Sequence, residues 1–243
     1  MQSDPLPTAT PGKPLLISFS GIDGAGKSTQ ILRLYESLEH AGLSVKLITF
    51  WDDVVQLKSF REQAAHKVFK GDKGVGSPEA PISRRDKNVQ SPILTAIRMT
   101  LYFLDTLALR QTVREVSSLG SQARPDVVIF DRYIYDELAN INFAHPLSGI
   151  YLRLLLLFIP KPDIALVLDA NPDEAFVRKP EYPLEFLRSN RNAYLELSRR
   201  IAGITVIPPM PIETAHDLIV KQTMKRYAPP PMGGVKGHIL QEK

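Results

Sequence analysis

Short apolar runs alternate along the chain with segments of helical periodicity between residues 15 and 227. Each run is bounded by turn-forming residues, which is typical of strands buried on both faces of a parallel sheet. The strands expected from this pattern cover residues 15–20, 45–50, 127–130, 164–168 and 204–207. Strands that alternate with helices indicate an α/β fold, in which helices cover both faces of one parallel sheet.

Helical periodicity is clearest over residues 27–41, where apolar side chains share one face and Gly42 provides a left-handed stop. A second helix is predicted to begin at Ser91-Pro92, because serine caps a helix and proline favours its first turn, and to run towards Gly120. The segment 71–90 is predicted to be a long loop, either functional or without fixed structure. Other helices are expected over residues 52–69, 148–159, 183–202 and 213–226.

Both ends of the chain are rich in proline, glycine and polar residues. We therefore expect one folded domain over residues 15–227, between disordered segments at residues 1–14 and 228–243. The first segment lacks the basic and apolar regions of a signal peptide. The most apolar run, residues 150–159, is about half of the ~20 residues that a membrane span needs. A cytoplasmic protein with no membrane partner is the expectation.

The charge of the chain is mildly positive. Its 30 lysines and arginines against 26 aspartates and glutamates leave a formal net charge of +4. This excess suits anionic small molecules, and no nucleic acid partner is predicted from it. The chain contains no cysteine, which excludes a disulfide framework and any cysteine-based metal or redox site.

A glycine-rich segment follows the first predicted strand directly. It reads Gly21-Ile22-Asp23-Gly24-Ala25-Gly26-Lys27-Ser28-Thr29 and matches the phosphate-binding loop (P-loop) pattern G-x-x-x-x-G-K-[ST]. The glycines let backbone N–H groups point at phosphate, Lys27 reaches the β- and γ-phosphates, and the Ser28 hydroxyl binds Mg²⁺. The predicted ATP-binding residues are Gly21, Asp23, Gly24, Ala25, Gly26, Lys27, Ser28 and Thr29.

A carboxylate follows the third predicted strand, where residues 127–130 lead directly into Asp131. Ligands of open parallel sheets gather at the carboxyl ends of the strands, so Asp131 is expected near the phosphates if this strand neighbours the first. There it would hold Mg²⁺ together with Ser28. The alternative is that Asp131 only caps the turn after the strand. The P-loop in the same chain favours the metal interpretation, and Mg²⁺ is the only metal expected because the histidines lack ligand spacing.

Residues 20–30 together with Asp131-Arg132-Tyr133 resemble the thymidylate kinase family. Residues 168–175 are similar to the fourth strand of that family and its following turn, and residues 178–197 resemble its lid and next helix. The resemblance implies a sheet of five strands in the order 2-3-1-4-5 and transfer of the γ-phosphoryl of ATP to dTMP. It also implies a homodimer.

The resemblance further implies roles for particular residues. Asp23 would contact the sugar of the acceptor, Arg132 its phosphate or the transferring phosphoryl, and Tyr133 the acceptor side. Family members with a neutral residue at the position of Ala25 take a catalytic arginine from the lid, and Arg178 and Lys179 are the first candidates for this cation here. Such cations suit a reaction that depends on positioning and charge stabilisation. The catalytic set is therefore Lys27, Asp131, Arg132 and Arg178, with Arg188 and Arg191 as second candidates for the lid arginine.

Three positions depart from the family pattern. Ser20 replaces a glutamate, residues 50–54 replace an Arg-Glu-Pro-Gly-Gly segment, and the helix around Asp105 has no arginine at the usual thymidylate-binding place. Arg98, one to two turns earlier, is a candidate replacement, and Trp51 is a candidate to stack on a base or else to pack in the core. The alternatives to dTMP kinase are a kinase with another small acceptor and an ATP-binding regulatory module with little turnover.

Overall fold

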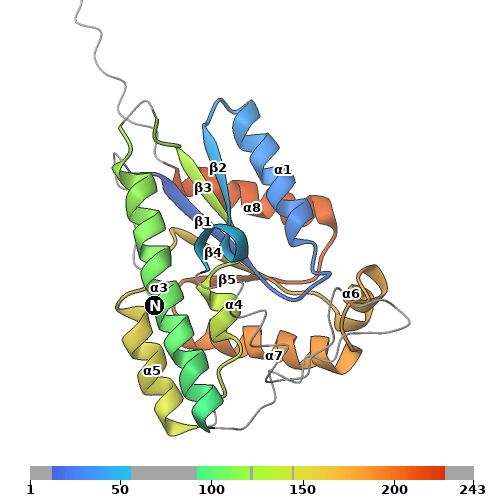
Figure 1. Cartoon of the computed structure of the whole chain (residues 1–243). Helices are drawn as coiled ribbons and strands as arrows, with labels where there is room; N and C mark the ends of the chain where they lie inside the picture. The colour runs from blue at the N-terminus through green and yellow to red at the C-terminus, as the bar shows by residue number, and fades with distance from the viewer. Residues whose placement is uncertain (1–12, 56–91, 121–122, 144, 228–243) are drawn as a thin grey trace, which may run out of the picture.

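A computed structural model describes residues 13–55, 92–120, 123–143 and 145–227 (Figure 1). Within these residues, five strands form one sheet in the order β2-β3-β1-β4-β5, and every neighbouring pair is parallel. The strands are β1 (Leu15–Ser20), β2 (Val45–Thr49), β3 (Val127–Asp131), β4 (Ile164–Leu168) and β5 (Ile204–Ile207). The predicted order is confirmed, and β1 occupies the centre of the sheet.

Helices cover both faces of the sheet, as predicted (Figure 1). Helices α1 and α8 pack on one face, whereas α3, α4, α5 and α7 pack on the other. The described helices are α1 (Lys27–His40), η1 (Phe50–Val54), α3 (Pro92–Ser118), α4 (Ile134–Leu138), α5 (Pro146–Leu156), α6 (Pro172–Arg178), α7 (Leu184–Arg200) and α8 (Ile212–Arg226).

The side chains of β1 alternate between the two faces of the sheet, so this one strand contributes to the core on both sides. Leu15, Ile17 and Phe19 pack against the α1 and α8 side, whereas Leu16 packs against the α3 and α7 side. Successive side chains of a strand point to opposite faces, so a strand covered on both sides must be apolar throughout or satisfy its polar groups. Ser20, the last residue of β1, is fully buried and donates its hydroxyl to a carboxylate on α4.

The second strand ends one residue earlier than predicted, and the helix expected over residues 52–69 differs where it is described. Phe50 begins η1, a five-residue π-helix, instead of ending β2. The Asp53 carboxylate accepts a hydrogen bond of 2.7 Å from the Thr49 amide, which turns the chain out of the strand at this point. The remainder of that predicted helix and the predicted loop at 71–90 lie outside the described residues.

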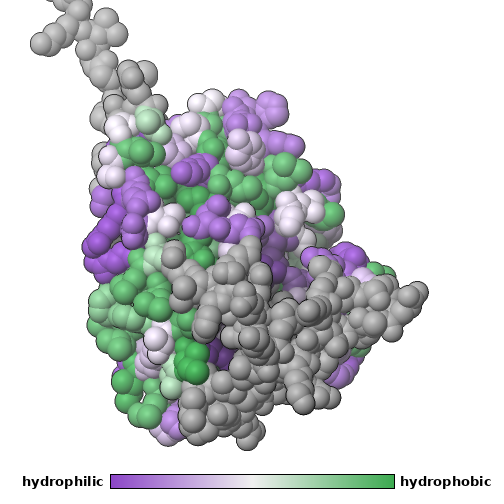
Figure 2. Space-filling view, in the orientation of Figure 1, coloured by the Kyte–Doolittle hydropathy of each residue, from purple (hydrophilic) through white to green (hydrophobic). Residues whose placement is uncertain are grey.

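The surface over α3 and α5 is apolar (Figure 2, lower left). Ile150 is 64% exposed and Leu157, just beyond α5, is 75% exposed, while Leu152 and Leu155 of the same helix are buried. The helix therefore has apolar side chains on its outer face as well as its inner face. No described helix combines the length and the apolar character that crossing a membrane requires.

Candidate functional site

The P-loop connects the central strand to α1. Gly24 and Gly26 have φ angles of 79° and 87°, in the left-handed region that glycine adopts readily. A Cβ atom on Gly24 would lie 2.5 Å from the Ala175 carbonyl oxygen of α6, so the loop also packs against that helix too closely for a side chain. The glycines of the motif thus serve both the turn itself and the approach of α6.

Lys27, the first residue of α1, lies inside this loop. Its side chain amine donates hydrogen bonds of 2.8 Å to the Gly21 carbonyl and 2.9 Å to the Ile22 carbonyl. Only 7% of the residue is exposed. Burial lowers the pKa of Lys27 to about 8, and the neighbouring positive charge of Arg132 acts in the same direction. A negatively charged phosphate beside the amine would favour its protonated form, which is the form that binds phosphate.

Ser28 and Asp131 are available for a metal. Asp131 ends β3 and pairs in register with Phe19 of β1, so it lies beside the strand that carries the P-loop. Among the described residues, neither the Ser28 hydroxyl nor the Asp131 carboxylate has a hydrogen bond or ion pair. A hydroxyl that binds the ion directly and a carboxylate that binds it through water suit Mg²⁺, which keeps several waters when it binds a protein. No described group of three or more metal-binding side chains offers a different site.

Arg132 has an unusual backbone and two acidic partners. Its φ of 67° is the only positive φ of a non-glycine residue among the described residues. Its guanidinium donates to the Asp23 carboxylate through Nη2 and lies 3.4 Å from Asp136 Oδ1 through Nη1. Burial alone would lower the pKa of Arg132, but Asp136 and Asp23 outweigh it and raise that pKa. The structure thereby gathers Asp23, Lys27, Asp131 and Arg132 at the carboxyl edge of the central strands.

The pKa of Asp23 is lowered, whereas that of Arg132 is raised. Burial would raise the pKa of Asp23, yet Arg132 and Lys27 together lower it. Asp23 is therefore a carboxylate held between two cations in the ligand-free protein. An acceptor hydroxyl that binds Asp23 has to share the carboxylate with Arg132.

The other predicted substrate contacts lie in different environments. Tyr133 is fully buried, and its hydroxyl donates to the Pro160 carbonyl at 2.5 Å, so its side chain packs in the core instead of facing an acceptor. Trp51 is half-buried in η1 and packs edge-on against Phe50. Arg98 lies on α3, one turn before the buried Tyr102. Burial and the charge of Glu137 raise the pKa of Tyr102 well above its ordinary value, and the positive charge of Arg98 opposes that rise.

The lid candidates lie around α6 and α7. Arg178 is exposed at the end of α6 and has no ion pair within the described part of the chain. Arg191 makes a two-pronged ion pair with Asp169, with nitrogen to oxygen distances of 2.6 and 2.7 Å, and Arg188 pairs with Asp173 and Glu185 on the surface. The Asp169 pair ties α7 to the loop after β4.

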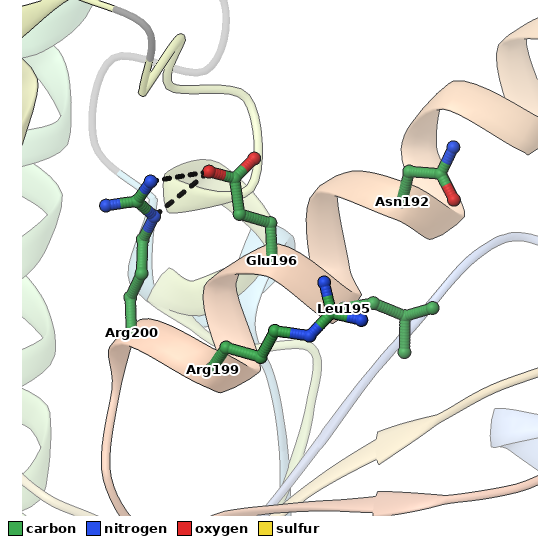
Figure 3. A pocket seen from close by; sticks show the side chains of 5 residues that line it. All are labelled: Asn192, Leu195, Glu196, Arg199 and Arg200. Atoms are coloured by element: carbon green, nitrogen blue, oxygen red, sulfur yellow. Dashed lines mark hydrogen bonds and ion pairs between the residues drawn. The ribbon is translucent and has the colours of Figure 1, made fainter.

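Two hollows on the described surface lie apart from the P-loop cluster. One, of about 490 Å³, is lined only by residues of α7 and contains an ion pair between Arg200 and Glu196 (Figure 3). The other, of about 560 Å³, lies where the β4–α6 loop, α7 and Pro209 meet, and Arg188 and Arg191 both line it. Neither hollow is lined by a P-loop residue, so the site is identified by the chemistry of its side chains and not by the size of a hollow.

Sequence reasoning missed a group of buried polar residues behind the site. Asp136 of α4 accepts hydrogen bonds from Ser20 of β1 at 2.6 Å and from Tyr194 of α7 at 2.7 Å. Asp105 of α3 and Glu137 of α4 are also buried. Their signal in the sequence is a charged residue inside an otherwise apolar helical face, which periodicity alone reads as a solvent-facing position.

A P-loop between the central strand and a helix, in a parallel sheet of order 2-3-1-4-5, is the arrangement of the P-loop kinase fold. A protein of Thermococcus kodakarensis named "Probable thymidylate kinase" is 31% identical over 215 residues, which cover 85% of this chain and 95% of that protein. Another of the same name, from Methanosphaera stadtmanae, is 29% identical over 216 residues, covering 87% of this chain and 98% of that protein. The chain belongs to the thymidylate kinase family. No family model matches it.

Proposed function

We propose that the protein transfers the γ-phosphoryl group of ATP to dTMP, giving ADP and dTDP. The observation that carries the proposal is the guanidinium of Arg132, held beside the P-loop by Asp23. A cation at this position can bind a second phosphate next to the one bound by Lys27. The names of the relatives, probable thymidylate kinases of archaea, support dTMP as the acceptor.

Each residue of the cluster has a part in this reaction. The P-loop amides and Lys27 bind the donor phosphates, and Arg132 orients the phosphate of the acceptor towards them. Phosphoryl transfer requires little covalent chemistry from the protein, so the rate depends on this alignment and on positive charge near the transferring group. Mg²⁺, held by Ser28 and by Asp131 through water, would supply further positive charge at the donor phosphates. Arg178 is the proposed cation from the lid.

A different small acceptor is the second candidate. The burial of Tyr133 favours it, since this tyrosine cannot contact an acceptor through its ring in the described conformation. Trp51 and Arg98 remain the proposed acceptor contacts, and neither fixes the identity of the base.

The test measures ADP formation by the full chain with Mg-ATP and each of dTMP, dUMP, UMP, CMP, AMP and GMP, beside a reaction without acceptor. Stimulation by dTMP alone is the expected result, and stimulation by another member of the panel would reassign the acceptor. Arg132→Lys should lose the stimulation, because one ammonium cannot reproduce a two-sided guanidinium contact. Arg33→Lys is the control, since Arg33 of α1 forms an exposed ion pair with Glu213 of α8. ADP release that no acceptor stimulates would refute the proposal.

We also propose a homodimer formed through the apolar surface over α3 and α5. Ile150, Leu154 and Leu157 are exposed there next to Leu104 and Leu107 of α3, and a contiguous apolar surface favours association. Ile150→Glu should convert the protein to a monomer in sedimentation velocity. Leu32→Glu, at a residue of α1 that is 58% exposed, should leave its mass unchanged. A monomeric parent protein would exclude the dimer. The cytoplasmic location and the absence of nucleic acid partners stay predictions.

A further inference from the structure

Asp136 lies in the first turn of α4 with 3% of its side chain exposed. Its Oδ2 accepts hydrogen bonds from the Ser20 hydroxyl at 2.6 Å and the Tyr133 amide at 3.0 Å. Its Oδ1 accepts a hydrogen bond from the Tyr194 hydroxyl at 2.7 Å and lies 3.4 Å from Nη1 of Arg132. A buried carboxylate with a donor on each side has little freedom to move, since any shift breaks a hydrogen bond in a medium that does not replace it.

The donors come from separate parts of the fold. Ser20 ends β1 directly before the P-loop, Arg132 and Tyr133 form the turn after β3, and Tyr194 lies in the middle of α7. Burial and the charge of Asp136 raise the pKa of Tyr194 well above its ordinary value, so the phenol keeps its proton. One carboxylate therefore joins the strand that carries the P-loop, the turn that carries Arg132 and the helix that follows the lid.

Arg132 is held from two sides, by Asp23 through Nη2 and by Asp136 through Nη1. The two partners differ in what else they do. Asp23 belongs to the P-loop and is the proposed partner of the acceptor sugar, so an acceptor hydroxyl shares its carboxylate with Arg132. Asp136 has no such second task, because its other donors are all buried groups of the protein. Asp136 can thus keep the guanidinium in place while Asp23 takes on a second partner.

We propose that Asp136 is a positioning residue that fixes Arg132 for phosphoryl transfer and, through Tyr194, ties the placement of this arginine to α7. The inference rests on the proposed function. Asp136 contacts neither substrate. It keeps the Arg132 guanidinium in place, so that the guanidinium does not move together with Asp23. Loss of its charge leaves Arg132 with one ionic partner among the described residues, Asp23 on the P-loop side.

The kinetic test uses Asp136→Asn, which keeps the size of the side chain and removes its charge, and Tyr194→Phe, which removes one donor. With Mg-ATP and dTMP, Asp136→Asn should lower kcat by roughly 10- to 100-fold, the range expected when a reacting group is misplaced by about 1 Å. The KM for ATP should stay within about twofold, while the KM for dTMP rises. Tyr194→Phe should show the same pattern more weakly, and it keeps the proposal testable if Asp136→Asn does not fold.

Asp126 provides a matched control at the opposite end of β3. Its carboxylate accepts hydrogen bonds of 2.8 Å from the Ser44 amide and hydroxyl and one of 3.3 Å from the Tyr227 hydroxyl, and no arginine takes part among the described residues. Asp126→Asn and Tyr227→Phe should lower thermal stability and leave kcat for each folded molecule unchanged. Equal kcat values for Asp136→Asn and Asp126→Asn would reduce Asp136 to a structural residue and overturn the proposal.

A readout without substrates separates this proposal from the proposed function. The side chain N–H signals of Arg132, assigned by their loss in Arg132→Lys, are expected to be distinct in the ¹H–¹⁵N spectrum of the free protein. In Asp136→Asn they should move towards the signals of exposed arginines, whereas in Asp126→Asn they should not. If no acceptor stimulates the parent protein, the proposed function fails while this spectrum still decides the placement of Arg132. Unchanged Arg132 signals in Asp136→Asn would overturn the inference.

Discussion

Replacing Lys27 by methionine should abolish phosphoryl transfer and make the stability of the nucleotide-free protein less dependent on pH. Burial lowers the pKa of Lys27 from 10.5 to about 8, and at about 1.4 kcal/mol for each pKa unit the charged amine costs the folded state about 3 kcal/mol at pH 7. Methionine leaves the buried Gly21 and Ile22 carbonyls without their donor, at about 1–3 kcal/mol each. The two effects are of similar size at pH 7, so the change with pH is the quantity that tests the charge penalty.

The charge penalty depends on pH in a direction that the lowered pKa of Lys27 determines. Because the pKa of Lys27 is lower in the folded protein than in the unfolded chain, the unfolded chain binds more protons between about pH 8 and 10.5. The charge penalty is fully present below pH 8 and disappears as the pH rises through that window. The parent protein should therefore gain stability relative to Lys27→Met on going from pH 7 to pH 10.5, and finally exceed it by the two hydrogen bonds.

Thermal unfolding of both proteins without nucleotide, at pH 7 and pH 10.5, measures this difference. Mg-ATP should raise the Tm of the parent protein and leave that of Lys27→Met unchanged, since the variant lacks the cation that meets the phosphates. Lys221→Met, at an exposed position of α8, is the control and should change the free energy of unfolding by less than about 0.5 kcal/mol at both pH values. An equal difference in stability between the two proteins at pH 7 and pH 10.5, or phosphoryl transfer by Lys27→Met, would refute the reasoning.

Three further substitutions test the loop, the metal site and the lid. Gly24→Ala should destabilise the protein by about 1–3 kcal/mol and weaken ATP binding in calorimetry, because of the φ of 79° at Gly24 and the nearby Ala175 carbonyl. Gly149→Ala on α5 is the control, since a Cβ atom there meets no atom within 4 Å, and it should neither destabilise the protein nor weaken ATP binding. Asp131→Asn should lower kcat by roughly 100-fold at saturating Mg²⁺ with an unchanged circular dichroism spectrum, and an unchanged rate would remove Asp131 from the site. Arg178→Ala should lower kcat more than about tenfold. Arg188→Ala should have little effect, because Asp173 and Glu185 already form ion pairs with that side chain. The reverse result would transfer the lid role to Arg188.

The sheet is predictable from the sequence because its strands are buried and therefore appear as continuous apolar runs. β1 and β4 are buried at every position, and their predicted limits agree with the structure. Helix α4 is not predictable in this way, since five residues are too few to show a period of 3.6. The order of the strands comes from the family resemblance, because apolar runs alone contain no information on which strands are neighbours.

The predictable part of the site is the part that is contiguous in sequence. The P-loop and the Asp131-Arg132 pair are short segments whose spacing reflects one turn each. The hydrogen bonds from Ser20 and Tyr194 to Asp136 join residues 116 and 58 positions apart, and only tertiary packing brings them together. The direction of the Tyr133 side chain was also not predictable from the sequence, because the left-handed backbone of Arg132 interrupts the alternation that would otherwise orient the next side chain.

The acidic partners of Arg132 also affect the charge that an incoming phosphate meets. Within the described part of the chain, the cluster at the P-loop combines two cations, Lys27 and Arg132, with three carboxylates, Asp23, Asp131 and Asp136. These five side chains carry a formal charge of −1, so the carboxylates offset the attraction that Lys27 and Arg132 alone would exert on a phosphate. Mg-ATP is itself an anion, so a bound donor does not make the cluster attractive to a second phosphate through net charge. The acceptor phosphate must therefore be held by direct contact with the Arg132 guanidinium, and not by the overall charge of the cluster.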